Sequence, residues 1–198
     1  METTIGSTRA AFLSRGAKGG LALVAGGSLL ALAEGGPAFG AAGADSDIAK
    51  LAATAELLAI DFYKRAIASK KFKGDELEYM GAALGNEQAH YQALAGVIGK
   101  SAPKGLRFKY PRGSFGSAKS IGGLGQALET AFVGAYMGAV IALKSNELKG
   151  VAAQIGANES RHLSVLTNIA AGRIVPAPAL PQVFTAAQAT KAVTPFLA

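Results

Sequence analysis

The sequence contains no cysteine and no tryptophan among its 198 residues, and only two histidines. Without cysteine the chain forms no disulfide, no thiolate zinc site and no rubredoxin-like iron site, and it carries out no thiol chemistry. The apolar stretch 21–33 has 13 residues, whereas a membrane-spanning helix needs about 20. Any imidazole chemistry therefore depends on His90 and His162.

Charged residues are also few, at 17%, while half of the residues are apolar. A chain of this length and composition can bury the core of one domain. Alanine and glycine dominate over valine, isoleucine and threonine, which favours helices over sheet, so the sequence predicts an all-α fold. The formal net charge of +7 makes nucleic acid or an acidic surface worth considering as a partner.

The first 44 residues are typical of an export signal. A positive segment with Arg9, Arg15 and Lys18 precedes the apolar stretch 21–33, and residues 42–44 read Ala-Gly-Ala, which offers a cleavage site. We therefore expect an exported protein, located in the periplasm or at the extracellular side of the cell envelope, with no stable membrane span after cleavage. The alternative is a retained amphipathic or membrane-anchoring N-terminus.

Residues 8–13, Thr-Arg-Ala-Ala-Phe-Leu, resemble a twin-arginine signal, with Phe12 and Leu13 at the expected offsets. The match is imperfect because Ala10 stands where the second arginine belongs. The export route therefore stays open between the twin-arginine route, which carries folded proteins, and the general secretory route, which carries unfolded chains.

Four stretches of the remaining chain have apolar residues at helical spacing, over about 45–69, 75–99, 121–144 and 146–172. Prolines and glycines forbid regular structure between about 100 and 120. The tail, 173–198, is also rich in proline, and Thr185 and Gln188 can cap one short helix there. Short turns within each pair of helices and a long connection between the pairs predict two antiparallel hairpins joined by a crossover. The predicted four-helix bundle covers residues 45–172.

Each of the two histidines lies three residues after a glutamate, and a lone glutamate lies about thirty residues upstream of each pair. Residues at i and i+3 share one helix face, and an antiparallel hairpin returns each pair to the level of its lone glutamate. This repeated order is typical of a four-helix bundle that holds two metal ions in its core. The candidate metal ligands are Glu56, Glu87, His90, Glu129, Glu159 and His162.

Four carboxylates in an apolar bundle would repel one another unless cations neutralise them. Two divalent ions supply the matching charge, and carboxylate and imidazole ligands without thiolate suit iron or manganese, although zinc could also occupy the site. The alternative is that Glu87 and His90 are a solvated pair on a helix surface.

The two hairpins repeat one another, since Glu56 and Glu129 are 73 residues apart and a tyrosine follows each by seven residues. These tyrosines, Tyr63 and Tyr136, are candidate catalytic residues, either as hydrogen-bond partners of a ligand or as redox-active phenols. The alternative is that both are core tyrosines. Two pairs of glycines, each pair spaced by four residues, are expected to let helices approach closely. They lie at 81 and 85 and at 134 and 138.

On the basis of these six candidate ligands, the chain resembles the ferritin-like superfamily over about residues 45–172. Within it, the chain is similar to exported bacterial ferritin-like domain proteins related to plant desiccation-related proteins. The resemblance implies a ferritin-like four-helix bundle with two iron or manganese ions bridged by carboxylates, which react with O2 or peroxide as an oxidase, a ferroxidase or a peroxide-detoxifying centre. The electron donor is unknown, and a homo-oligomer is compatible with the sequence.

Three other functions stay open. The same centre could serve an iron-storage protein, or the chain could be a non-enzymatic stress or desiccation-protective protein with a structural or vestigial metal site. The crossover is basic and carries interleaved aromatic residues, a pattern found in nucleic-acid-binding segments, but a solvated loop over the bundle is the favoured interpretation, and no nucleic acid is expected as a partner of an exported protein.

Overall fold

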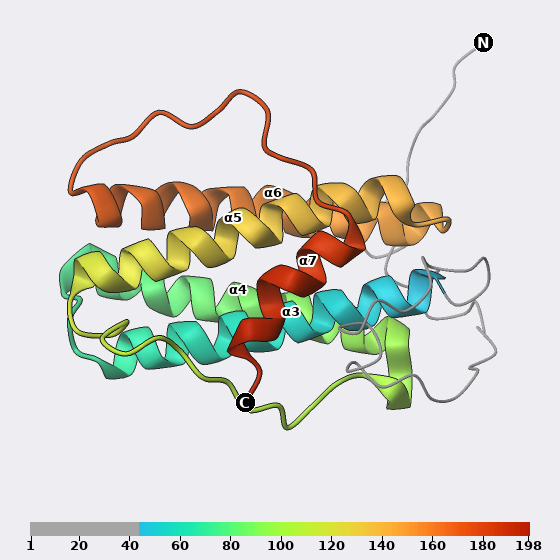
Figure 1. Cartoon of the computed structure of the whole chain (residues 1–198), viewed down its shortest axis with the longest axis horizontal. Helices are drawn as coiled ribbons and strands as arrows, with labels where there is room; N and C mark the ends of the chain where they lie inside the picture. Colours follow the sequence, from blue (N-terminus) through green and yellow to red (C-terminus); the bar gives the residue numbers. More distant parts are fainter. Residues whose placement is uncertain (1–43) are drawn as a thin grey trace, which may run out of the picture.

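The computed structural model describes residues 44–198, so the predicted export signal lies almost entirely outside the described residues. Four long helices form the described part of the chain: α3 (Ala44–Ala68), α4 (Gly74–Ile98), α5 (Ala118–Ala142) and α6 (Asn146–Ala171). A short helix, α7 (Ala186–Val193), follows near the C-terminus. The four long helices lie side by side as a bundle, and α7 crosses it (Figure 1). The predicted all-α four-helix fold is confirmed.

The bundle consists of two antiparallel hairpins, α3–α4 and α5–α6, and the helices of each hairpin make most of their helix contacts with each other. Local signals define the helix ends. Ser117 and Ser120 form a capping box at the start of α5, and the Ser145 side chain accepts a hydrogen bond from Leu148 N at the start of α6. Gly172 ends α6 in the left-handed conformation, at φ 66°, which favours glycine.

The core is apolar on both sides of a central belt of charged ligands. One cluster surrounds Phe62, Met80, Ile121 and Leu166, and a second cluster packs at the opposite end of the bundle around Leu94. Such burial stabilises the fold by roughly 1.5–3 kcal/mol for each large apolar side chain. These two clusters hold the four helices at the level where the ligand side chains meet.

The crossover, residues 99–117, runs along the bundle without a long helix (Figure 1). Its aromatic side chains face the core: Phe108 is buried, and Tyr110 and Phe115 pack against the cluster around Phe62. Phe108 also pairs with Leu197 in an isolated antiparallel bridge. The basic side chains of this segment are exposed, so the crossover is a loop that is anchored by its aromatic residues and presents its charges to solvent.

The C-terminal segment returns across the second hairpin. Phe184 N donates a hydrogen bond to Gly134 O, and a Cβ at Gly138 would lie 1.7 Å from Phe184 O. The expected role of the glycines in helix–helix approach is therefore wrong. Nothing lies within 4 Å of a Cβ built at Gly81 or Gly85, and the other two glycines admit the C-terminal backbone instead of a helix.

One helix of the described residues, α5, is long and apolar enough to cross a membrane by length and composition alone. In the bundle, however, α5 packs against α6 and α7 and buries Glu129 and Tyr136. A core helix of a bundle passes the same test, so this property carries little weight.

Candidate metal centre

All six candidate ligands meet in the middle of the bundle. Glu56 comes from α3, Glu129 from α5, and α4 and α6 each supply one glutamate and one histidine. The four glutamates and His162 are at most 1% exposed, whereas the His90 side chain is 13% exposed. In each Glu-x-x-His pair the histidine Nδ1 lies within 3.3 Å of its own glutamate, because the two residues share one helix face.

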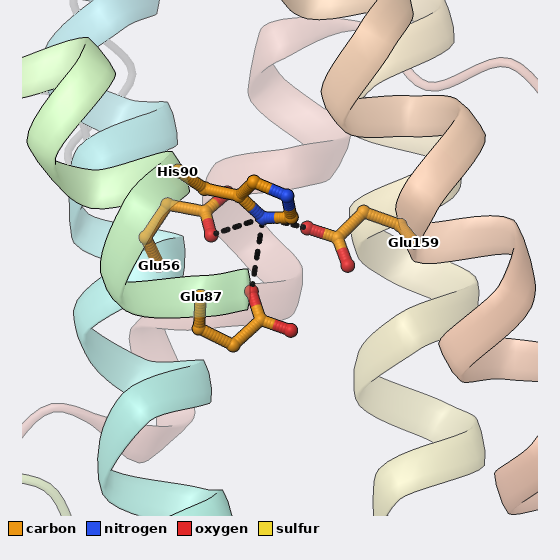
Figure 2. A group of neighbouring side chains, drawn as sticks. All are labelled: Glu56, Glu87, His90 and Glu159. Atoms are coloured by element: carbon orange, nitrogen blue, oxygen red, sulfur yellow. Dashed lines mark hydrogen bonds and ion pairs between the residues drawn. The ribbon is translucent and has the colours of Figure 1, made fainter. Parts of the chain in front are cut away.

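His90 is surrounded by carboxylates from three helices. Its Nδ1 lies 3.3 Å from Glu56 Oε2, 3.3 Å from Glu87 Oε2 and 3.3 Å from Glu159 Oε1. Figure 2 shows these three carboxylates pointing toward the same ring nitrogen. One ring nitrogen carries at most one hydrogen, so it cannot satisfy three acceptors. A cation placed among these groups would bind all of them.

His162 forms the matching cluster. Its Nδ1 lies 2.7 Å from Glu87 Oε1, 3.0 Å from Glu159 Oε2 and 3.8 Å from Glu129 Oε1. The donor atoms therefore form two overlapping groups that could each hold a metal ion, with all atoms of a group within 4.8 Å of one another. Glu87 and Glu159 belong to both groups, whereas Glu56 and His90 belong to one and Glu129 and His162 to the other.

The residues present fit metal ions as ligands. Each of the four glutamates has one buried oxygen without a well-aligned hydrogen bond: Glu56 Oε2, Glu87 Oε1, Glu129 Oε2 and Glu159 Oε1. All except Glu129 Oε2 lie within 3.3 Å of an imidazole Nδ1, which they share with other carboxylates. Such an oxygen is costly in a protein interior, by roughly 1–3 kcal/mol or more for a charged group. No lysine or arginine forms an ion pair with these carboxylates among the described residues. Oxygen and nitrogen donors without thiolate suit iron or manganese.

The electrostatics of the cluster differ among Glu56, Glu87 and Glu129. Burial and the charge of Glu159 raise the pKa of Glu56 and of Glu129 well above the ordinary range. Burial also acts to raise the pKa of Glu87, but hydrogen bonds with His162 and His90 outweigh it and lower this pKa to about 2. Among these three carboxylates, Glu87 is thus the one that stays ionised most readily in the metal-free centre.

The histidines carry the compensating charge. Burial acts to lower their pKa values, but hydrogen bonds with the surrounding carboxylates outweigh it. They raise the pKa of His90 to about 12 and that of His162 to about 9. In the metal-free protein, the protons on the histidines therefore neutralise the carboxylates in place of metal ions. Metal binding must displace those protons.

Two tyrosines hold the unshared glutamates. Tyr63 OH donates a hydrogen bond to Glu129 Oε1 at 2.7 Å, and Tyr136 OH donates one to Glu56 Oε1. Burial and the charge of the neighbouring glutamate raise the pKa of both phenols well above the ordinary value. Both tyrosines therefore stay protonated at neutral pH. Each comes from the hairpin opposite to the glutamate that it contacts, so the repeated tyrosines also bind the two hairpins together.

Sequence reasoning assigned no role to two residues that lie beside His162. Asn86 lies 3.2 Å from His162 Nε2, and the Tyr79 ring packs edge-on against the His162 ring, with centroids 6.3 Å apart. The buried Tyr79 hydroxyl has no hydrogen-bond partner. Tyr79 precedes Glu87 by eight residues, about two helical turns, and this spacing is the signal that could have revealed it. Asn86 directly precedes Glu87, but its role needs the fold because its partner belongs to the other hairpin.

Comparison with known families matches residues 44–172 to a model described as a ferritin-like domain. This range includes all four long helices and all six candidate ligands. A search of curated proteins found no match.

Proposed function

Because the chain belongs to the ferritin-like domain family, we propose that it is a dinuclear metal protein that reacts with O2 or peroxide. The observation that carries the proposal is the pair of overlapping buried donor groups with two shared glutamates. Two iron or manganese ions bound there would supply the electrons that reduce the oxidant, two electrons and two protons being needed to convert O2 to hydrogen peroxide. Export to the periplasm or the cell envelope remains part of the proposal.

The ligand roles follow from the geometry. Glu56 and His90 would hold one ion, Glu129 and His162 would hold the other, and Glu87 and Glu159 would bridge them. This arrangement places one imidazole and one unshared carboxylate on each ion. Four carboxylates and two divalent ions give a neutral centre, which removes the repulsion that burial imposes on the metal-free cluster.

The surrounding side chains orient the ligands. Tyr63 and Tyr136 each hold one oxygen of an unshared glutamate, which leaves the other oxygen, Oε2, without a well-aligned hydrogen bond and able to bind an ion. Since each histidine faces the carboxylates through Nδ1, an ion would bind there and the proton would stay on Nε2. Rotation of the Asn86 amide would then present its oxygen to the His162 Nε2 proton.

Metal content tests the proposal directly. Protein purified without chelator, or loaded with Fe(II) or Mn(II) without oxygen, should contain about two ions per chain by elemental mass spectrometry. The double variant Glu87→Ala/His162→Ala should lose them. Glu78→Ala is the matched control because Glu78 is an exposed acid on the same helix as Glu87, and it should keep both ions.

Reactivity is the second part of the test. Fe(II)-loaded protein mixed with air or peroxide should oxidise its iron faster than protein-free buffer does. If the protein takes up no metal during anaerobic loading, or if its iron is oxidised no faster than free Fe(II) in buffer, the proposed reaction is contradicted. Sizing of the protein separates this function from iron storage, which requires a cage or a large oligomer.

A further inference from the structure

An apolar cavity of about 40 Å³ lies between α3, α5 and the C-terminal segment. Ala52 of α3 and Ala135 of α5 line it, and Phe184 and α7 cover it in part, so that it stays partly open to solvent. Most of the other lining residues are also alanine or glycine, whose side chains are too short to fill the space between the helices. In Figure 1, α7 crosses the bundle over α5 and α3, so the cavity lies beneath this helix.

Tyr136 connects this cavity to the candidate metal centre. Its side chain lines the cavity, while its hydroxyl donates a hydrogen bond to Glu56 Oε1. Glu56 belongs to the donor group that contains His90, which is the more exposed of the two histidines. The cavity thus adjoins one specific half of the centre, the half formed by Glu56 and His90.

The size of the cavity limits its occupant. Pockets for organic ligands are about 300–1,000 Å³, so a cavity of about 40 Å³ has room for a molecule of a few atoms and not for a hydrocarbon chain. A buried water needs two to four polar partners. The lining offers one polar side chain, Tyr136, whose hydroxyl proton is already donated to Glu56. Water and peroxide therefore find too few partners there, whereas a small apolar molecule needs none.

We propose that this cavity binds dioxygen, a small apolar gas, next to the Glu56 and His90 half of the centre. The inference rests on the proposed function and narrows its oxidant from O2 or peroxide to O2. Tyr136 both lines the cavity and donates a hydrogen bond to the candidate ligand Glu56, which makes this side chain a boundary between the gas and the ligands.

Xenon is the probe for the cavity, because it binds small dry apolar cavities and needs no metal. Metal-free protein crystallised and pressurised with xenon should show a xenon atom between Ala52 and Ala135. Ala135→Leu adds three carbon atoms to the wall and should abolish this xenon site. Ala127→Leu is the matched control: Ala127 is exposed on the same helix, so xenon binding should be retained.

Ala52→Leu fills the cavity from the opposite helix and replaces Ala135→Leu if that variant does not fold. Folded wild-type protein without xenon in this cavity would overturn the gas site. Xenon binding in a protein that takes up no metal would support the gas site and overturn the proposed function. The failure of one proposal can therefore be distinguished from the failure of the other.

The identity of the gas is tested with Fe(II)-loaded protein. Ala135→Leu should raise the KM for dioxygen severalfold at unchanged kcat, whereas Ala127→Leu should leave both unchanged. Oxidation by hydrogen peroxide should proceed equally in both variants because peroxide does not use the cavity. An equal dependence on dioxygen concentration in both variants would overturn the assignment of dioxygen.

Discussion

The two helix hairpins supply equal sets of candidate ligands, one lone glutamate and one Glu-x-x-His pair each, but they surround their histidines differently. His162 is 1% exposed and contacts both Asn86 and Tyr79. The His90 side chain is 13% exposed, and Asn158, the residue that matches Asn86 in the sequence repeat, has a buried Oδ1 without a hydrogen bond. The comparison teaches that the repeat provides the ligands, whereas the contacts made around each histidine distinguish the two halves of the centre.

The largest effect is expected from breaking the centre at a shared ligand. Glu87→Ala removes a carboxylate that belongs to both donor groups, and it should abolish binding of both ions. Glu56→Ala and Glu129→Ala each remove a ligand of one group and should leave about one ion per chain. Elemental mass spectrometry of the three variants measures the difference. Equal metal loss in all three would show that the two halves do not act separately.

The surfaces of the two hairpins should also respond differently to the same substitution. Gly138→Ala in α5 would place a Cβ against the Phe184 backbone, which should lower the free energy of unfolding by about 2–3 kcal/mol. Gly81→Ala in α4 meets nothing within 4 Å and should raise it by about 0.5–1 kcal/mol, because alanine favours the helix. Urea unfolding measures both. A stable Gly138→Ala protein would mean that the C-terminal segment can detach at low cost.

The contrast between these glycines shows which contacts the sequence alone does not predict. Helical spacing defines the faces of each helix, so the long helices and the convergence of the six ligands follow from local patterns. The glycines at 134 and 138 give the same pattern as those at 81 and 85, yet only the former pair meets another segment. That contact depends on Phe184, more than forty residues downstream, in a proline-rich stretch whose course no periodicity defines.

The two asparagines of the repeat give a smaller expected effect. Asn86→Ala removes the partner of His162 Nε2 and should weaken metal binding on that side about 10–100-fold, the usual cost of losing such support. Asn158→Ala removes an oxygen without a partner and should change metal affinity little. Competition with a metal chelator measures both. Equal losses would indicate that Asn158 supports His90 once metal is bound.

Stability of the metal-free protein should change gradually with pH. A histidine whose pKa is raised on folding stabilises the folded state below its unfolded pKa of about 6.5, and this contribution is lost as pH rises through the folded pKa. His162, at about 9, should lose its proton before His90, at about 12. The free energy of unfolding should therefore fall between about pH 6.5 and 9, and bound Mn(II) should reduce the fall.

Urea unfolding at several pH values, with and without Mn(II), measures this dependence. The raised pKa values of Glu56 and Glu129 act in the same direction, since ionisation of these buried carboxylates also destabilises the metal-free fold as pH rises. Glu87 acts in the opposite direction, but only in acid, as pH falls from its unfolded pKa of about 4.3 toward about 2. A flat profile between pH 6.5 and 9 would contradict the assigned charges.

The six candidate ligands could be predicted from the sequence, but which of them belong to both donor groups could not. The i, i+3 spacing predicts that Glu87 and His90 lie together, and the lone glutamates follow from the hairpin geometry. Which carboxylates serve both donor groups depends on how far each helix is rotated about its own axis, and that rotation is determined by core packing. The spacing of Tyr79 from Glu87 places both on neighbouring turns of one helix, but the repeat gives no support for a contact with His162, because the residue 72 positions later, Val151, has no comparable side chain.

The bridge between Phe108 and Leu197 has a consequence for the order in which contacts form during folding. The two residues are about ninety positions apart, and Lys109 N also donates a hydrogen bond to Phe196 O. The helices α5, α6 and α7 lie between these two residues in the sequence, so the bridge closes a long loop, whereas the turns within each hairpin join helices that are neighbours in the sequence. Closing the longer loop costs more chain entropy, so we expect the hairpins to form first and the C-terminal segment to dock onto them last.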